Sequence, residues 1–127
     1  MITRLQALAV GTVGVLMVAS PLFGHHTWAV DRTQVLTVKG TVTGFAWSNP
    51  HVQILLDAKD DKGKVEKWTA GGPSTARMAG SGWNKDTVKP GDVITAVGHR
   101  ATDGSNLLRV QKVVLSSGQE LTGYGNQ

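Results

Sequence analysis

Four histidines are the residues of this sequence best suited to metal chemistry. His25 and His26 are neighbours near the N-terminus, His51 follows a Ser-Asn-Pro turn, and His99 comes late in the chain. Imidazole is the commonest metal-binding side chain in proteins. The chain contains no cysteine, so a metal site here would use nitrogen rather than thiolate ligands. Such a ligand set suits Cu(II) best, with Ni(II) and Zn(II) behind it.

The N-terminal segment predicts export to the bacterial periplasm. Residues 1–24 have one arginine near the front, an apolar run over about residues 8–19, and a Ser-Pro break before small residues. This is the layout of a secretory signal peptide. The apolar run is shorter than the about 20 residues that a membrane-spanning helix needs. We therefore expect a cleaved signal and no membrane span in the mature protein, with an uncleaved membrane anchor as the alternative.

Signal cleavage would create the strongest version of the metal site. A cut after Gly24 makes His25 the first residue, so that its free amine and its imidazole form a two-nitrogen chelate for copper. The candidate partners in this site are His26, His51 and His99. The competing interpretation makes His25 and His26 a solvent-exposed start of the chain. In that interpretation His51 and His99 each hydrogen-bond within a turn.

A metal-free binding site is the second hypothesis, and it rests on aromatic and basic residues. Aromatic rings beside basic groups can stack on a sugar or a base and hold charged ligands. The candidate residues are Trp47, Trp68, Lys67, Arg100 and Arg109. The ligand would be a cell-envelope sugar, a peptide or a partner protein. Each tryptophan also has a simpler interpretation as a core residue.

Charge and motif content argue against nucleic-acid binding and against catalysis. Without residues 1–24 the chain carries 12 basic and 9 acidic side chains, a formal charge of +3. This excess is small beside the basic stripe of a nucleic-acid-binding domain, and an exported protein meets little nucleic acid. The serines in turns lack a nucleophile elbow, and no glycine-rich phosphate loop opens a helix. We expect a non-catalytic binding or accessory module.

Alternating apolar and polar residues predict the strands that would position these side chains. The alternation is clearest over residues 35–46, and its phase changes beyond Gly44, which predicts a bulge in a long first strand. A second strand is expected to open at His51. Ser74 can cap a short helix. The remaining expected elements are strands over residues 65–70, 93–98 and 107–115 and a helix over residues 74–79.

Three strands, a short helix and two further strands are the element order of the OB-fold, a five-stranded Greek-key barrel. A β-sandwich is the alternative, and the single helix after the third strand argues against it. A closed sheet also suits a small exported domain without disulfides, because closure removes exposed strand edges. The expected organisation is a signal peptide (1–24), a lead-in (25–33), an OB-like barrel (34–115) and a flexible C-terminal tail (116–127).

Several short motifs occur in one order along the mature chain. They are His25-His26-Thr27, FAWSNPH over residues 45–51, SGW over residues 81–83, VKPGD over residues 88–92, and Gly98-His99 followed by Asp103-Gly104-Ser105. This series resembles a family of short exported bacterial proteins catalogued as domain of unknown function 6152. The resemblance covers essentially the whole mature chain. It implies the compartment and the positions of the motifs, and it carries no activity over to this chain.

Overall fold

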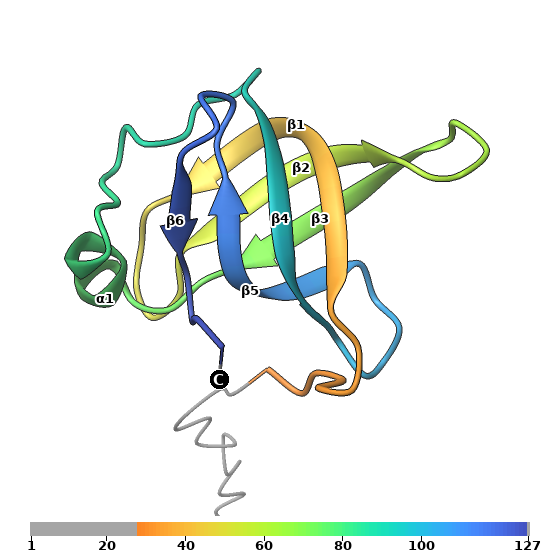
Figure 1. Ribbon diagram of the computed structural model, residues 1–127, viewed down its shortest axis with the longest axis horizontal. Helices are drawn as coiled ribbons and strands as arrows, with labels where there is room; N and C mark the ends of the chain where they lie inside the picture. Colours follow the sequence, from red (N-terminus) through yellow and green to blue (C-terminus); the bar gives the residue numbers. More distant parts are fainter. Residues whose placement is uncertain (1–27, 127) are drawn as a thin grey trace, which may run out of the picture.

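The structure is a computed structural model that describes residues 28–126. These residues form a β-barrel with one short helix, shown in Figure 1. The elements in chain order are β1 (Leu36–Ala46), β2 (Gln53–Lys59), β3 (Val65–Gly71), α1 (Thr75–Gly80), β4 (Val93–Arg100), β5 (Leu107–Val114) and β6 (Glu120–Thr122). No helix within residues 28–126 is long and apolar enough to cross a membrane.

The strand pairing confirms the OB-like barrel that the sequence predicts. β1, β2 and β3 form an antiparallel meander, β4 pairs with the first half of β1, and β5 pairs with β4. A parallel pairing of β3 with β5 then closes the barrel. The helix α1 lies between β3 and β4, as expected for this fold. Because β1 pairs with β2 and with β4, one long strand serves both sides of the barrel, and the sandwich alternative is wrong.

The bend of β1 has a local cause in its glycines. The register of β1 against β2 shifts between Val42 and Gly44, which confirms the bulge expected at this point. A Cβ atom on Gly40 would overlap the backbone carbonyl of Asp57 on β2. Glycine at this position therefore allows the two strands to approach closely while β1 coils around the barrel.

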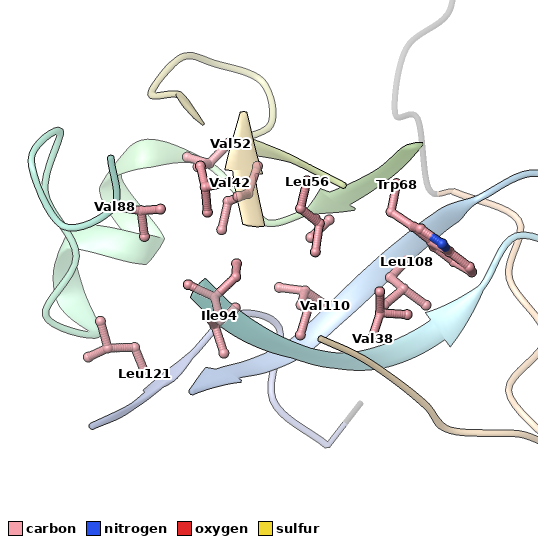
Figure 2. Packing of buried hydrophobic residues seen from close by; sticks show 14 of the residues in the cluster. Val38, Val42, Val52, Leu56, Trp68, Val88, Ile94, Leu108, Val110 and Leu121 are labelled. Carbon is pink, nitrogen blue, oxygen red and sulfur yellow. The ribbon is translucent and has the colours of Figure 1, made fainter. Parts of the chain in front are cut away.

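One hydrophobic core fills the barrel, and Figure 2 shows most of its side chains pointing toward one another. Each large apolar side chain that is fully buried stabilises the fold by about 1.5–3 kcal/mol. Trp83 is 2% exposed and its indole Nε1 donates to the carbonyl of Thr122 at 2.9 Å. The largest fully buried side chains are Ile54, Leu56, Met78, Ile94, Leu108, Val42, Val52, Val88, Val110 and Val113.

The second strand begins two residues later than the sequence indicated, at Gln53 rather than His51. Residues before it pair with the segment that follows β3 instead of with β1. Val52 N donates to Pro73 O at 3.0 Å, and Gly72 N donates to Val52 O at 2.8 Å. These two backbone hydrogen bonds hold the adjacent His51 at one end of the barrel.

The expectation of a flexible tail over residues 116–127 is wrong for its central part. β6 pairs with β5 through Lys112–Thr122, Val113–Leu121 and Val114–Glu120. Leu121 is 7% exposed and joins the core, and the backbone N–H of Tyr124 donates to Val110 O at 2.9 Å. β6 has three residues and only one inward side chain, so it is too short to be recognised from alternating apolar and polar residues.

Candidate functional site

The two ends of the described chain meet at one end of the barrel. Figure 1 shows the orange segment that leads into β1 beside the blue segment that leaves β6. At this place five side chains from separate elements lie together. We call them the Tyr124 cluster: Trp28, His51, Arg77, Arg109 and Tyr124.

His51 is held by hydrogen bonds to its surroundings at the start of β2. Its Nδ1 lies 3.2 Å from Gly72 O and 3.1 Å from the Tyr124 hydroxyl. The Tyr124 hydroxyl in turn donates to Gly72 O at 3.2 Å. A hydrogen on His51 Nδ1 satisfies this arrangement, because the carbonyl can only accept. In that tautomer the lone pair of the imidazole is on Nε2.

Trp28 packs its ring against both partners of that hydrogen-bond network. Its ring centroid lies 4.5 Å from that of His51, with the planes tilted by 37°, and 6.2 Å from that of Tyr124 in an edge-on arrangement. A Cβ atom on Gly71 would overlap the Trp28 ring. The last residue of β3 must therefore be glycine for the lead-in segment to reach this position.

Two arginines converge on the ring of Tyr124. The guanidinium carbon of Arg109 lies 3.7 Å from the ring centroid, and that of Arg77 lies 5.4 Å away. Arg77 Nη2 also donates to the carbonyl of Tyr124 at 3.1 Å. Arg77 is placed by α1, whose N-terminus is capped by Ser74 as the sequence predicted. Such cation–π contacts are attractive, most strongly where water is excluded.

Burial and charge act in opposite directions on these groups. Burial raises the pKa of Tyr124, and the positive charges of Arg109 and Arg77 partly oppose that rise. Burial lowers the pKa of Arg109, the charge of Tyr124 opposes this, and the nearby charges of Arg32 and Arg77 lower it further. The end of the barrel around Tyr124 is therefore a region of concentrated positive charge.

His99 has a different environment, inside the barrel wall. It is 6% exposed, and its Nδ1 lies 2.8 Å from Gln34 O while its Nε2 lies 3.2 Å from Gln111 Nε2. A hydrogen on Nδ1 donates to the carbonyl, and Nε2 accepts from the amide. Both ring nitrogens are thus engaged by the chain itself. His99 joins the lead-in segment to β4 and β5, and in this arrangement it offers no nitrogen to a metal ion.

The predicted copper ligands are therefore not brought together by the residues that the structure describes. His25 and His26 lie outside these residues. Within residues 28–126, no group of three or more His, Cys, Asp or Glu side chains is arranged to hold a metal ion. His51 is the only predicted ligand among the described residues that lies in the Tyr124 cluster.

The predicted aromatic and basic face is divided among separate places. Trp68 is buried, and the guanidinium carbon of Arg100 lies over its ring, 5.1 Å from the ring centroid. The same guanidinium donates to Gly104 O at 2.7 Å. Trp47 packs against Phe45 with ring centroids 6.0 Å apart. Lys67 and Trp68 do share a groove of about 290 Å³ along β2 and β3. Arg109 alone of the five candidates belongs to the Tyr124 cluster.

Three members of the cluster were missed from sequence. Trp28 and Tyr124 stand in segments without a periodic pattern, and Arg77 stands on an exposed turn of a short helix. Tyr124 is the only tyrosine of the chain and is flanked by glycines at positions 123 and 125. Gly123 packs so closely on Val110 that a Cβ atom there would overlap it. An aromatic residue between two glycines was the one available signal.

The fold and this cluster define the class of the protein as a small OB-like barrel with an aromatic and basic surface where the chain enters and leaves. The chain belongs to the family of unknown function DUF6152, whose model matches residues 12–108. This confirms the resemblance seen in the sequence motifs. The match includes Trp28, His51 and Arg77, and it ends just before Arg109. A comparison with curated proteins found no match.

Proposed function

We propose that this protein is an exported, non-catalytic binding or accessory module of the bacterial envelope that recognises its ligand at the Tyr124 cluster. The ligand is a small envelope component, such as a sugar or peptide, or an exposed group of a partner protein. Export is inferred from the signal-like pattern of residues 1–24. The barrel serves as the rigid support, since binding residues at the ends of strands are held by a packed core.

One observation carries this proposal: two guanidinium groups, an imidazole and two large aromatic rings from five separate segments meet at one place. Burial lowers the pKa of Arg109, so holding its charged guanidinium at this half-buried position costs free energy of desolvation. Aromatic rings beside guanidinium groups are also enriched where proteins bind partners and ligands. The cluster is therefore better suited to recognition than the divided set of Trp47, Trp68 and Lys67.

The test uses the exported chain labelled with ¹⁵N and titrated with neutral and charged envelope fragments, such as muropeptides and oligosaccharides. We expect the amide signals of Trp28, Gly72 and Tyr124 to shift with one saturable isotherm. Lys67→Gln serves as the matched control, because Lys67 is exposed on another part of the barrel. Saturable binding that shifts β2 and β3 signals around Lys67 and leaves Tyr124 unchanged would move the site to the groove on those strands.

Copper binding remains a second candidate, and the contact of Trp28 with His51 favours it. His26 precedes Trp28 by two residues in the sequence, and Trp28 contacts His51. In this candidate, His51 is proposed as a further ligand of an N-terminal chelate formed by His25. The positive charge of Arg77 and Arg109 acts against a cation in the same place.

A Cu(II) titration of the secreted protein separates the two candidates. Mass measurement first establishes whether His25 is the first residue. Copper binding through this site predicts one tight equivalent, weakened in both His25→Ala and His51→Ala. Lys67→Gln, which lies on β3, should leave the copper affinity unchanged. Absence of tight copper uptake by the correctly trimmed protein would remove the copper candidate and leave the aromatic and basic site untouched.

A further inference from the structure

We propose that the outer face of the barrel has a second binding surface, which takes an acidic and aliphatic segment of a partner protein. Two adjoining hollows form this surface, and we call it the Lys39 groove. The residues that define it are Lys39, Lys59, Val65, Val93, Val114 and Leu115. None of them belongs to the Tyr124 cluster, so this inference does not rest on the proposed function.

The two hollows are continuous because they share two residues. One hollow, of about 410 Å³, lies over β1, the end of β2 and the starts of β3 and β4. The other, of about 320 Å³, lies over β4 and the end of β5. Lys39 and Val93 line both hollows. Lys39 on β1 pairs with Thr95 on β4, and Thr41 pairs with Val93, so these side chains are on one face of the sheet.

Aliphatic side chains gather at this groove. Four large apolar residues between residues 28 and 126 are exposed, and two of them line the first hollow: Val65 is 54% exposed and Val93 is 42% exposed. The partly buried Val114 and Leu115 line the second hollow. Single exposed aliphatic residues are normal on a protein surface, whereas an apolar patch with polar groups around it is typical of a contact with another protein.

The charge in the groove is positive. Lys39 and Lys59 are exposed and line the first hollow. Within residues 28–126, neither lysine is in a side-chain ion pair. Asp57 is the one acidic residue of this part of the chain that lines either hollow, and Lys67 Nζ lies 3.5 Å from its Oδ1. The groove is therefore complementary in charge to the carboxylates of a ligand.

Acidic residues of the β2–β3 hairpin, which extends beyond the barrel in Figure 1, line a separate hollow. These residues are Asp60, Asp61 and Glu66, and Lys39 and Lys59 line that hollow too. Asp60 accepts two backbone N–H groups of its own turn, at 2.8 Å and 2.9 Å. In the described part of the chain none of the three forms an ion pair with either lysine. The two lysines thus border the aliphatic groove, where the carboxylates of a partner can approach them.

A segment with both aliphatic and acidic side chains fits this groove best. Its aliphatic groups would cover Val65 and Val93, while its carboxylates approach Lys39 and Lys59. Lysine side chains are suited to such a contact, because their stems are apolar and their heads stay in water. A second copy of this chain is less suited, since a symmetric contact would bring the same lysines toward one another.

The test uses the secreted chain labelled with ¹⁵N and a synthetic peptide with the repeat Leu-Leu-Glu-Glu. In an extended or a helical peptide this repeat places leucines beside glutamates. The same peptide with glutamine in place of glutamate is the comparison. We expect the acidic peptide to shift the amide signals of Lys39, Lys59, Val65 and Val93 with one saturable isotherm. Its affinity should fall as the ionic strength rises, and the glutamine peptide should bind more weakly.

Two double variants that lose the same charge test the lysines. Lys39→Gln/Lys59→Gln changes the groove, and Lys62→Gln/Lys64→Gln changes two exposed lysines in the neighbouring hairpin turn that do not line it. We expect about threefold to tenfold weaker binding of the acidic peptide in the first variant, the loss typical of two exposed ion pairs. The second variant should match the wild type. All four side chains are exposed, so Tm should not change in either variant.

A matched pair of valine variants tests the apolar contact. Val93→Thr replaces one methyl group in the groove by a hydroxyl and keeps a β-branched side chain in the strand. Val35→Thr makes the same change at another exposed valine, which is 54% exposed and lines neither hollow. Only Val93→Thr should weaken the binding of the acidic peptide, by about threefold.

Several results would overturn the partner-binding groove. They are no saturable binding by the folded wild type, equal binding of the two peptides, and an equal loss of affinity in the two lysine variants. Shifts at Lys39 and Val93 that depend on protein concentration without peptide, with a dimer in sedimentation, would make a second copy the occupant. Peptide shifts confined to Trp28 and Tyr124 would remove the groove and leave the proposed function standing.

Discussion

The two histidines among the described residues, His51 and His99, have different surroundings. His51 lies just before β2, and His99 lies in β4. His99 is 6% exposed, and both of its ring nitrogens are within hydrogen-bond distance of groups of its own chain. His51 is half-buried at the end of the barrel, where it meets a tyrosine hydroxyl and a tryptophan ring beside two arginines. The first arrangement holds the fold together, and we propose that the second presents side chains to a ligand.

This difference shows that residue type alone does not assign a role. In the sequence, His51 and His99 were equal candidates for one copper site. Burial decides between them, because a buried imidazole must have its nitrogens satisfied by the protein. A histidine at an open rim can instead share its partners with a ligand. We therefore expect substitution of His99 to lower mainly the stability of the fold, and substitution of His51 to affect mainly ligand binding.

The largest effect is expected from His99→Ala. The change leaves the Gln34 carbonyl and the Gln111 amide without their partner and opens a cavity, so we expect a loss of about 2–4 kcal/mol in the free energy of unfolding. His51→Ala should cost about 1 kcal/mol or less, because its surroundings are open to water. Urea unfolding of both variants measures the difference. Equal losses of unfolding free energy in the two variants would contradict the structural role of His99 and the less buried role of His51.

Gly71→Ala tests the contact between Trp28 and His51 at the end of the barrel. The added Cβ would overlap the Trp28 ring, so the ring must move away from His51. We expect a loss of about 1–3 kcal/mol from overpacking. Nuclear Overhauser contacts between Trp28 and His51 should also vanish, with those of His99 unchanged. Gly80→Ala is the control, since a Cβ there meets nothing within 4 Å. Survival of the Trp28–His51 contacts in Gly71→Ala would contradict the packing described.

Tyr124→Phe should have a smaller effect, of about 1 kcal/mol in the free energy of unfolding. It removes the hydroxyl that contacts His51 Nδ1 and Gly72 O and keeps the ring on which the arginines lie. Tyr124→Leu, which removes the ring as well, should cost clearly more. Chemical denaturation of the two variants separates the hydrogen bond from the cation–π contacts. Equal losses would mean that the arginines gain little from the aromatic face.

The barrel could be predicted from sequence because its signals are local. Apolar alternation in β1 and a capped helix before β4 each specify one element, and the OB-like order follows from the order of the expected strands and the helix. The bulge after Val42 was likewise visible in the change of phase at Gly44. The order of the first five strands and the helix could therefore be predicted without knowledge of distant contacts.

The site could not be predicted in the same way, because five separate segments build it. No spacing in the chain relates Trp28, Arg77 and Tyr124, which meet only after the barrel closes. The prediction that Trp68 on β3 contributes to an exposed aromatic and basic face was wrong for a different reason. That strand has apolar residues in both phases, with Val65 outside and Trp68 inside, so alternation could not decide which way the tryptophan pointed.

The smallest expected effect is a dependence on alkaline pH. Burial raises the pKa of Tyr124 above its ordinary value of 10.0, with the charges of Arg109 and Arg77 opposing the rise. The folded state thus favours the neutral phenol. Its contribution to stability is fully present below about pH 10 and is lost as pH rises through the higher pKa of the folded protein. Tyr124 is the only tyrosine, so phenolate absorbance reports this group alone.

The same titration extends the comparison to the arginines. In Arg77→Gln one of the opposing positive charges is gone, so the pKa of Tyr124 should rise further than in the wild type. Lys67→Gln, which removes a charge from β3 outside the cluster, should leave the midpoint where it is. The protein unfolded in urea supplies the reference near pH 10. A folded-state midpoint at or below that reference would mean that positive charge, and not burial, dominates around Tyr124. The rim would then be more open to water than His51 and Trp28 indicate.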